Sequence, residues 1–386
     1  MALLVESARA YGRGLLQGIA HYVRDHAPWS MDYQERELND PPPSWLARWQ
    51  GDGIIARVET PAMAQAIKRL RVPAVDLIYC LPGLDMPSVR TDEPAVIRMV
   101  MEYWQQRGFR QVAYCGFDGL YYSELRKKLY QQAAAKAGMT CHLYHAPHRL
   151  AHALTRRMEQ EGMAQAAHLG RWLRSLPKPI ALLACNDVRA QQVLSVCRSE
   201  GISVPDEIAV LGIDNDEVLC DLCDPPLSSV LLNARQIGYE AARLLEGMMR
   251  HRKPPAKPIY LGPVKIITRR STDVLAIDDP QVAAILRLIR ERACEGLKVE
   301  ELIRSVPVSR TLLERRFTRH VGRSLKQEIL RVQIERAKTL LHETDFSISA
   351  VAEQCGFKYV EYFNGLFHER VGQTPRRYRQ QRQAGA

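Results

Sequence analysis

The sequence predicts two domains of different class: an α/β domain over residues 1–270 and an all-α domain over residues 280–386. In the first region, short apolar runs alternate with longer helical stretches, which is typical of a doubly wound sheet. From Pro280 onward the pattern is helical only. The length of 386 residues also exceeds that of an ordinary single domain.

The apolar runs of the first region are predicted to be buried parallel strands. Such strands have near-continuous Val, Ile, Leu and Ala, as these runs do. Gly108, Gly138 and Gly201 stand where helices would end. The predicted strands are 3–5, 53–56, 75–78, 111–115, 180–184, 208–213 and 228–232, with two more within 259–269. The predicted helices are 14–24, 94–107, 123–136, 164–175, 188–200 and 235–250.

Two sets of such strand–helix units imply two lobes. Ligands of these sheets bind outside the carboxyl ends of the strands, so we expect a binding cleft between the lobes. Residues 271–279 are read as a short polar linker to the second domain.

The helical domain contains two predicted helix-turn-helix motifs, at 299–320 and 347–370. In the first motif, Ser309 is a good N-cap, and Leu313 and Phe317 share one helix face at i, i+4. In the second motif, Phe363 and Phe367 repeat that spacing. A packed helical bundle is the alternative reading of these apolar pairs.

A helix at 324–341 separates the two motifs and would hold them apart by about 27 Å. Two recognition helices at such a spacing suit successive major grooves of DNA, whose repeat is about 34 Å. The net charge of +11 is concentrated here, because residues 279–386 carry about +7 of it. This charge and the repeated motif favour binding to double-stranded DNA over a plain bundle.

Residues 299–379 resemble the DNA-binding domain of the AraC family. The resemblance lies above all in residues 347–379, SISAVAEQCGFKYVEYFNGLFHERVGQTPRRYR, with its Gly-Phe, Phe-x3-Phe, Gly-x-Thr-Pro and Tyr-Arg positions. It implies base contacts from Thr311, Glu314 and Arg315 in the first motif and from Glu361, Tyr362 and Gly365 in the second. The chain departs from the family at Pro307-Val308 and at Gly365, where the family has a large polar side chain, so the second motif should discriminate bases less.

The other predicted DNA contacts come from polar and basic side chains around the two motifs. An arginine such as Arg315 can bind guanine through two hydrogen bonds, and a glutamate can accept from cytosine. Phosphate contacts position the protein on the duplex. The remaining candidates are Ser309, Arg310, Arg319, Arg323, Lys326, Tyr359, Thr374 and Arg376.

The first 270 residues resemble the LacI-type sensor, a two-lobed fold similar to type I periplasmic binding proteins. The resemblance rests on LLACND at 182–187 and VPDEIAVLGIDN at 204–215. With the sensor placed before an AraC-type domain, nearly the whole chain resembles the xylose-responsive activators, a resemblance that 10–19 and 269–273 support. This resemblance implies an activator of sugar catabolic genes, responding to xylose or a related pentose. The relatives that share this order have a neutral polar residue where this chain has Glu6, so the sugar's identity stays open.

The predicted effector site follows from strand-end positions and from this resemblance. Asp, Asn and Arg side chains can each bind two adjacent sugar hydroxyls, and an aromatic ring packs on the sugar's CH groups. Asp92 and Asp214 could instead be helix caps, Asn186 a turn residue and Arg126 a surface charge. The predicted effector residues are Tyr11, Arg13, Asp92, Arg126, Asn186 and Asp214.

Other function classes are disfavoured by what the sequence lacks. Nine scattered cysteines suit a reducing compartment, and Cys220 and Cys223 lack a second ligand pair for zinc. No phosphate loop, dinucleotide fingerprint or nucleophile elbow is present, so we expect neither an enzyme nor a cofactor. We expect a cytoplasmic homodimer that binds directly repeated operator sites, contacts RNA polymerase and has no membrane partner. A sugar-binding protein or enzyme of doubly wound fold without DNA binding is the alternative.

Overall fold

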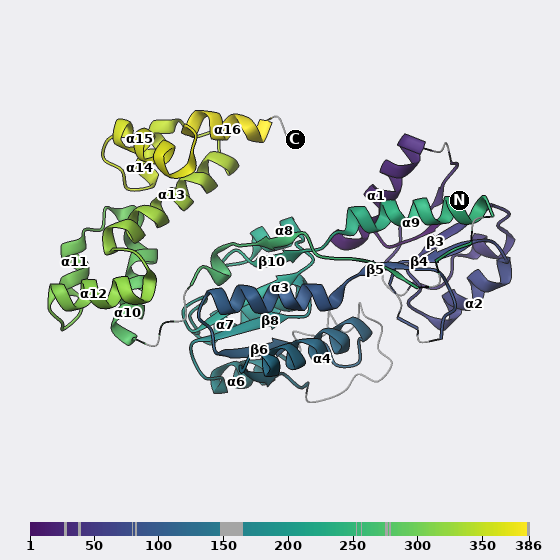
Figure 1. The fold of residues 1–386 in the computed structure, drawn as a ribbon, viewed down its shortest axis with the longest axis horizontal. Coiled ribbons are helices and arrows are strands. Elements are labelled where there is room, and N and C mark those ends of the chain that lie inside the picture. The colour runs from purple at the N-terminus through teal and green to yellow at the C-terminus, as the bar shows by residue number, and fades with distance from the viewer. Residues whose placement is uncertain are drawn as a thin grey trace. The chain divides into compact units, whose positions relative to one another are not determined.

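The computed structural model describes residues 1–26, 29–37, 40–78, 80–81, 83–146, 165–251, 253–255, 257–274, 277 and 279–383. The chain forms two compact units, Met1–Ala276 and Ile277–Ala386, which Figure 1 shows in purple to green and in green to yellow.

The first unit begins with a four-stranded parallel sheet in the order β2-β1-β3-β4. Its apolar strands are buried, and β1 and β3 have no exposed residue. Helix α9 returns from far along the chain to pack on α1 beside this sheet. The elements are β1 (Ala2–Leu4), β2 (Asp32–Tyr33), β3 (Ile54–Ala56), β4 (Ala74–Asp76), α1 (Ala10–His26), α2 (Pro61–Leu70) and α9 (Ala234–Met249), with a 3-10 turn at Ser44–Arg48.

A second sheet of the same unit has six strands in the order β12-β10-β9-β8-β6-β7. All neighbours are parallel except β12, which runs antiparallel to β10. The strands are β6 (Gln111–Cys115), β7 (Thr140–Leu143), β8 (Ile180–Ala184), β9 (Ile208–Ile213), β10 (Ser228–Leu231) and β12 (Lys265–Ile267). The helices are α3 (Glu93–Gln106), α4 (Tyr121–Lys136), α6 (Ala166–Ser175), α7 (Asp187–Ser199) and α8 (Glu217–Leu222).

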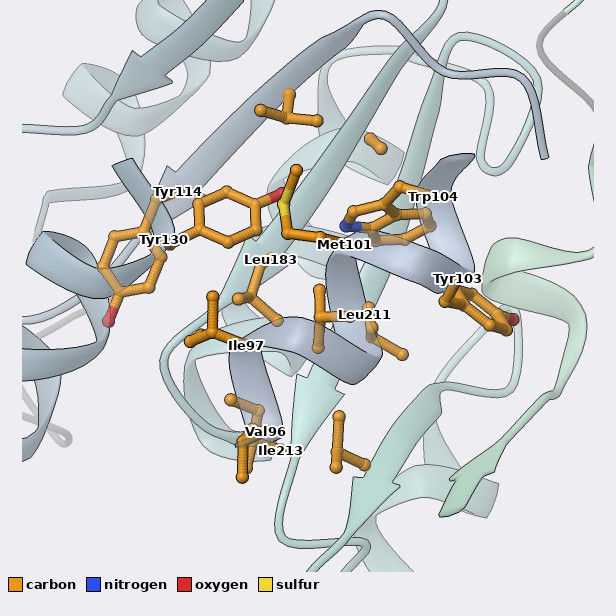
Figure 2. Close-up of a cluster of buried hydrophobic side chains, with 14 of the residues drawn as sticks. Val96, Ile97, Met101, Tyr103, Trp104, Tyr114, Tyr130, Leu183, Leu211 and Ile213 are labelled. Atoms are coloured by element: carbon orange, nitrogen blue, oxygen red, sulfur yellow. The ribbon is translucent and has the colours of Figure 1, made fainter. Parts of the chain in front are cut away.

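Buried clusters cover both faces of this second sheet, one between its strands and helix α3 and the other between its strands and helices α6 and α7. Figure 2 shows Met101 and Trp104 of α3 beside Leu183 and Leu211 of β8 and β9, and all four are buried. A separate two-stranded parallel pair, β5 (Val89–Thr91) and β11 (Ile259–Leu261), completes the unit.

Every predicted strand and helix of the first region has a counterpart, with ends shifted by a few residues; Ala164, at the start of one predicted helix, lies outside the described residues. The predicted polar linker is wrong at its start. Ser271 and Thr272 are fully buried, and Ser271 Oγ donates to the Val210 carbonyl of β9 at 2.6 Å. Residues 271–274 therefore belong to the first unit, because Ser271 satisfies buried backbone groups of β9 and β10 and the Thr272 hydroxyl donates to the Ser228 hydroxyl at 2.7 Å.

The second unit is all-helical and contains both predicted helix-turn-helix motifs. Leu313, Phe317, Phe363 and Phe367 are fully buried, as their i, i+4 spacing predicts. The separating helix ends two residues later than predicted, at Glu343. The elements are α10 (Pro280–Arg292), the 3-10 turn η4 (Ala293–Glu295), α11 (Val299–Arg304), α12 (Arg310–Val321), α13 (Leu325–Glu343), α14 (Ile348–Gln354), α15 (Val360–Val371) and α16 (Pro375–Gln383).

Candidate effector pocket and nucleic-acid interface

The first unit contains a pocket of about 900 Å³. Its lining residues follow the carboxyl ends of strands from both large sheets: Arg57 follows β3, Leu77 follows β4, Asn186 follows β8 and Asp214 follows β9. This is where a doubly wound fold places its ligands.

The structure brings five of the six predicted effector residues into the lining of this pocket. Arg13 is the exception. Its Nη1 donates to the carbonyls of Ser7 and Ala8 at 3.0 and 3.1 Å, and its Nη2 pairs with Asp216 at 3.3 Å. The five that meet at the pocket are Tyr11, Asp92, Arg126, Asn186 and Asp214.

Asp92 and Asn186 are helix caps as well as lining residues. Asp92 Oδ1 accepts from the Ala95 amide at 2.9 Å, and Asn186 Oδ1 accepts from the Arg189 amide at 2.9 Å. The Asn186 amide nitrogen also donates to the Tyr122 hydroxyl at 3.1 Å. Asp92 and Asn186 can therefore cap a helix and line the pocket at the same time, because the capping hydrogen bond uses only the Oδ1 atom of each side chain.

Arg126 is buried rather than a surface charge. Its guanidinium forms two hydrogen bonds of 2.8 Å with Glu93, and its Nη1 donates to the Cys185 carbonyl at 2.6 Å. Burial by itself would lower the pKa of Arg126, but the Glu93 carboxylate raises it above its usual value. Arg126 is thus a fixed cation of the pocket wall.

A second fixed cation, Arg57, was not predicted from the sequence. It pairs with Glu6 and with Glu59, the latter at 3.0 Å, and its guanidinium carbon lies 5.5 Å from the centre of the Tyr11 ring. Burial raises the pKa of Glu6 to about 6, against the opposing effect of Arg57. The strand-end position of Arg57 was the available signal, since it directly follows the run at 53–56.

Asp187 is a second pocket residue that sequence reasoning missed, although it lies in the quoted LLACND motif. Its carboxylate accepts from the Ser229 hydroxyl at 2.6 Å and from the Asp216 amide at 2.8 Å. Burial raises the pKa of Asp187 well above its usual value, and Asp214 adds to the shift. Two carboxyl groups therefore interact at this wall, where the backbone of Asp214 has a φ of +113°.

The first helix-turn-helix motif presents basic side chains on the exposed face of α12. Ser309 caps this helix by accepting from the Leu312 amide. Thr311, Arg315 and Arg319 are exposed, whereas Arg310 and Glu314 pair at 3.0 Å. The face that remains is positively charged.

The second motif presents aromatic rather than basic side chains. Tyr359 and Tyr362 are 60% and 52% exposed, and Glu361 is exposed beside them. Gly365 has no side chain with which to contact a base. A Cβ placed there would meet no atom within 4 Å, so the structure has room for a larger residue at this position.

The candidate phosphate contacts lie at helix starts. Lys326 and Arg376 are exposed in the first turns of α13 and α16. Thr374 precedes α16 and accepts from the Arg377 amide at 3.4 Å. Arg323 is engaged within the unit, since it pairs with the buried Glu328 at 3.4 Å.

Among the described residues, no group of three His, Cys, Asp or Glu side chains could hold a metal ion. Within that same part of the chain, no helix is long and apolar enough to cross a membrane.

Family models match nearly the whole chain in three parts. Residues 1–80 match a XylR N-terminal domain, residues 101–272 a periplasmic binding protein-like domain, and residues 302–381 a helix-turn-helix domain.

Individual relatives match over the full length. The chain is 31% identical to the xylose operon regulatory protein of Escherichia coli K12, over 98% of this chain and 96% of the relative. It is 30% identical to the protein of that name from Haemophilus influenzae, over 98% and 97%. A solved structure of the xylose-binding transcription activator xylR aligns with a TM-score of 0.76 at 30% identity, covering 98% of this chain and 97% of that one. The chain belongs to the family of xylose operon regulatory proteins, transcription regulators in which a periplasmic-binding-protein-like sensor precedes an AraC-type DNA-binding domain.

Proposed function

We propose that this regulator binds a pentose, xylose or a close relative, in the pocket of the first unit, and that this binding switches on genes of sugar catabolism. The proposal assigns no catalytic step to the chain. It includes a homodimer, operator sites arranged as direct repeats, and contact with RNA polymerase.

The observation that carries the sugar proposal is the set of planar polar side chains around one cavity. Asp92, Asn186 and Asp214 stand at strand or helix ends beside the fixed Arg126, and Tyr11 and Tyr122 add aromatic surface. This combination suits a ring with adjacent hydroxyls and apolar CH faces. A relative of the same domain order is described as xylose-binding.

DNA recognition is assigned to α12 and α15. The helix between them, α13, has 19 residues and is therefore about 28 Å long. We propose that the two recognition helices enter successive major grooves, with Arg315 as the main base-reading residue and Lys326 and Arg376 on phosphates. Closure of the two lobes, each built on one of the large sheets, around the sugar would shift the equilibrium between DNA-competent and DNA-incompetent arrangements of the protein.

Thermal unfolding of the full chain against a panel of aldopentoses, hexoses and their acids tests the effector. Ligand at 100 times its Kd should stabilise the sensor by about 2.7 kcal/mol. The variant Asp214→Asn should lose most of this shift, while Asp52→Asn, an exposed carboxylate outside the pocket lining, should keep it. Absence of a shift with every sugar would overturn the effector proposal.

Duplex binding separates a regulator from a sugar-binding protein or enzyme. We expect the full chain to bind DNA with an affinity that falls steeply with salt, because each phosphate contact releases counterions. A chain that binds sugar but no duplex at low salt would be a sugar-binding protein instead.

A further inference from the structure

Two cysteines that are far apart in sequence lie together in the second unit. Cys294 is in the turn η4, and Cys355 is the C-cap of α14, directly before the turn of the second motif. The two residues are neighbours in space, because Gly356, which follows Cys355, lies against the Cys294 carbonyl, and each thiol affects the pKa of the other. Cys355 is fully buried and Cys294 is half-buried, so a small oxidant can reach the pair through Cys294.

The backbone around the pair is tightly packed. A Cβ placed on Gly356 would lie 2.7 Å from the Cys294 carbonyl oxygen, and Gly356 has a φ of +78°. Gln333 of α13 donates to the Ala293 carbonyl at 2.9 Å. Backbone packing therefore brings three segments together at the two thiols: η4, α13 and the α14–α15 turn.

Cys294 also has the electrostatic surroundings of a reactive thiol. The neighbouring Cys355 thiol, opposed by burial and assisted by Arg336, lowers the pKa of Cys294 to about 7. By contrast, burial raises the pKa of Cys141 to about 11 and that of Cys223 to about 11. Since the thiolate is the reactive form, Cys294 is the thiol most ready to react near neutral pH among these three.

We propose that Cys294 and Cys355 form a peroxide-sensitive dithiol site, whose oxidation to a disulfide weakens the binding of this regulator to DNA. The effect on DNA binding rests on the proposed function, whereas formation of the disulfide does not.

The chemistry needs only a hydroperoxide. The Cys294 thiolate attacks one peroxide oxygen, the O–O bond breaks, and the released hydroxide is protonated to water, leaving a sulfenic acid. The Cys355 sulfur then attacks the Cys294 sulfur, the S–O bond breaks, and the leaving hydroxide takes the Cys355 proton. Two thiols lose two electrons and hydrogen peroxide becomes two waters, and a dithiol reductant reverses the change.

The consequence for DNA binding follows from the geometry. A disulfide requires a sulfur separation of about 2.05 Å, closer than two thiols that are not bonded to each other. Bond formation must therefore draw η4 and the α14–α15 turn together, at a point where Gly356 already contacts the Cys294 carbonyl. Helix α15 follows this turn and η4 precedes the first motif, so the spacing of the two recognition helices changes.

The test uses the reduced full chain and a fluorescent duplex that this reduced chain selects from a random library. Treatment with a small excess of hydrogen peroxide should produce a Cys294–Cys355 disulfide in peptide mass spectrometry and weaken duplex binding at least about fivefold, with recovery in dithiothreitol. Cys294→Ser should bind as the reduced protein does and resist peroxide. Cys141→Ser, which removes another half-buried thiol, should respond as the wild type does.

Each outcome bears on the inference. If no Cys294–Cys355 disulfide forms, or if it forms without changing duplex affinity, the inference is overturned. A loss of binding that Cys294→Ser also shows would assign the effect to another residue and would overturn it as well. If the reduced chain selects no duplex, the proposed function fails, while mapping of the disulfide still decides whether the dithiol site exists.

Discussion

Arg126 and Glu93 form a pair of parallel hydrogen bonds, both 2.8 Å long, with side chains only 6% and 14% exposed. The pair joins the start of α3 to α4, and Arg126 also binds the carbonyl of Cys185 after β8. Both residues line the pocket, so one interaction serves both the stability of the first unit and the shape of this pocket.

Replacement of this arginine should destabilise the sensor strongly. Arg126→Met leaves the Glu93 carboxylate without its cation, and loss of one partner of a buried pair costs about 3–5 kcal/mol. All five tryptophans lie in the first unit, so urea unfolding followed by tryptophan fluorescence reports on the sensor alone. Arg243→Ala, which removes an exposed arginine paired with Glu240, should cost less than about 1 kcal/mol. Equal losses for the two variants would refute the structural role of Arg126.

The crossing of α1 and α9 should not tolerate a methyl group. A Cβ on Gly18 would lie 1.8 Å from the Arg235 carbonyl oxygen, so the helices must separate. Gly18→Ala should lower the free energy of unfolding of the sensor by about 1–3 kcal/mol, despite the better helix propensity of alanine. Gly365→Ala is the matched control, because space is open there, and it should stabilise the second unit by up to about 1 kcal/mol. Circular dichroism follows the control, and a stabilised Gly18→Ala would contradict the observed packing.

The stability of the sensor should fall as pH rises from about 4.5 to above 6. Burial raises the pKa of Glu6 from 4.5 to about 6, so in this window the unfolded chain releases its proton before the folded one does. Ionisation of Glu6 then lowers the free energy of unfolding by about 2 kcal/mol, and this loss is complete once the pH exceeds the pKa of Glu6 in the folded protein. Glu6→Gln should remove that part of the pH dependence in urea unfolding at pH 4.5 and 7. The exposed Glu35→Gln should leave it in place, and identical pH profiles for wild type and Glu6→Gln would show the assignment to be wrong.

Two adjacent arginines of α12 should differ in their effect on DNA binding. Arg315 is exposed, whereas Arg316 donates to Gln281 at 3.0 Å and lies 3.7 Å from Asp279. Arg315→Ala should weaken binding to a selected duplex by about 1–3 kcal/mol and relax the preference at one base pair. Arg316→Ala should leave the preference unchanged. Fluorescence anisotropy with the selected duplex and single-base variants measures both, and an altered preference in Arg316→Ala alone would reverse the assignment.

Removal of a phosphate contact should have a different signature. Arg376 is exposed in the first turn of α16, and Arg376→Ala should weaken all duplexes alike and lower the salt slope by about 1. Titration at several salt concentrations measures the slope. A change confined to one sequence would instead make Arg376 a base-reading residue.

Periodicity was a strong guide to the elements because burial acts on it directly. The paired apolar residues of α12 and α15 predicted which faces pack, and the runs at 180–184 and 208–213 predicted fully buried strands. Some elements were not predicted. These are strands β2, β5 and β7 and helices α2, α8 and α16. In α8, Val218 and Leu222 are exposed, so that helix has no continuous apolar face.

The pocket was predictable only in part. Strand-end position and the family resemblance led to Tyr11, Asp92, Arg126, Asn186 and Asp214. Strand-end position is informative because the carboxyl ends of the parallel strands of a sheet lie along the same edge. Arg57 was missed although it directly follows the predicted run at 53–56; what the chain order does not reveal is its pairing with Glu6 and Glu59, which holds it in the pocket wall. Arg13 was included on the same two grounds, but its guanidinium binds the backbone carbonyls of Ser7 and Ala8 and does not line the pocket.

The sequence by itself determined the order of the two units, the class of each, the helix-turn-helix motifs and the family, because these depend on periodicity and on residues close together in the chain. Only the tertiary structure decided which charged side chains line the pocket together, that residues 271–274 belong to the first unit, and that Cys294 lies beside Cys355. The physical reason is that burial and electrostatic pairing depend on distances in space, and those distances are set by the packing of segments that the chain order keeps far apart.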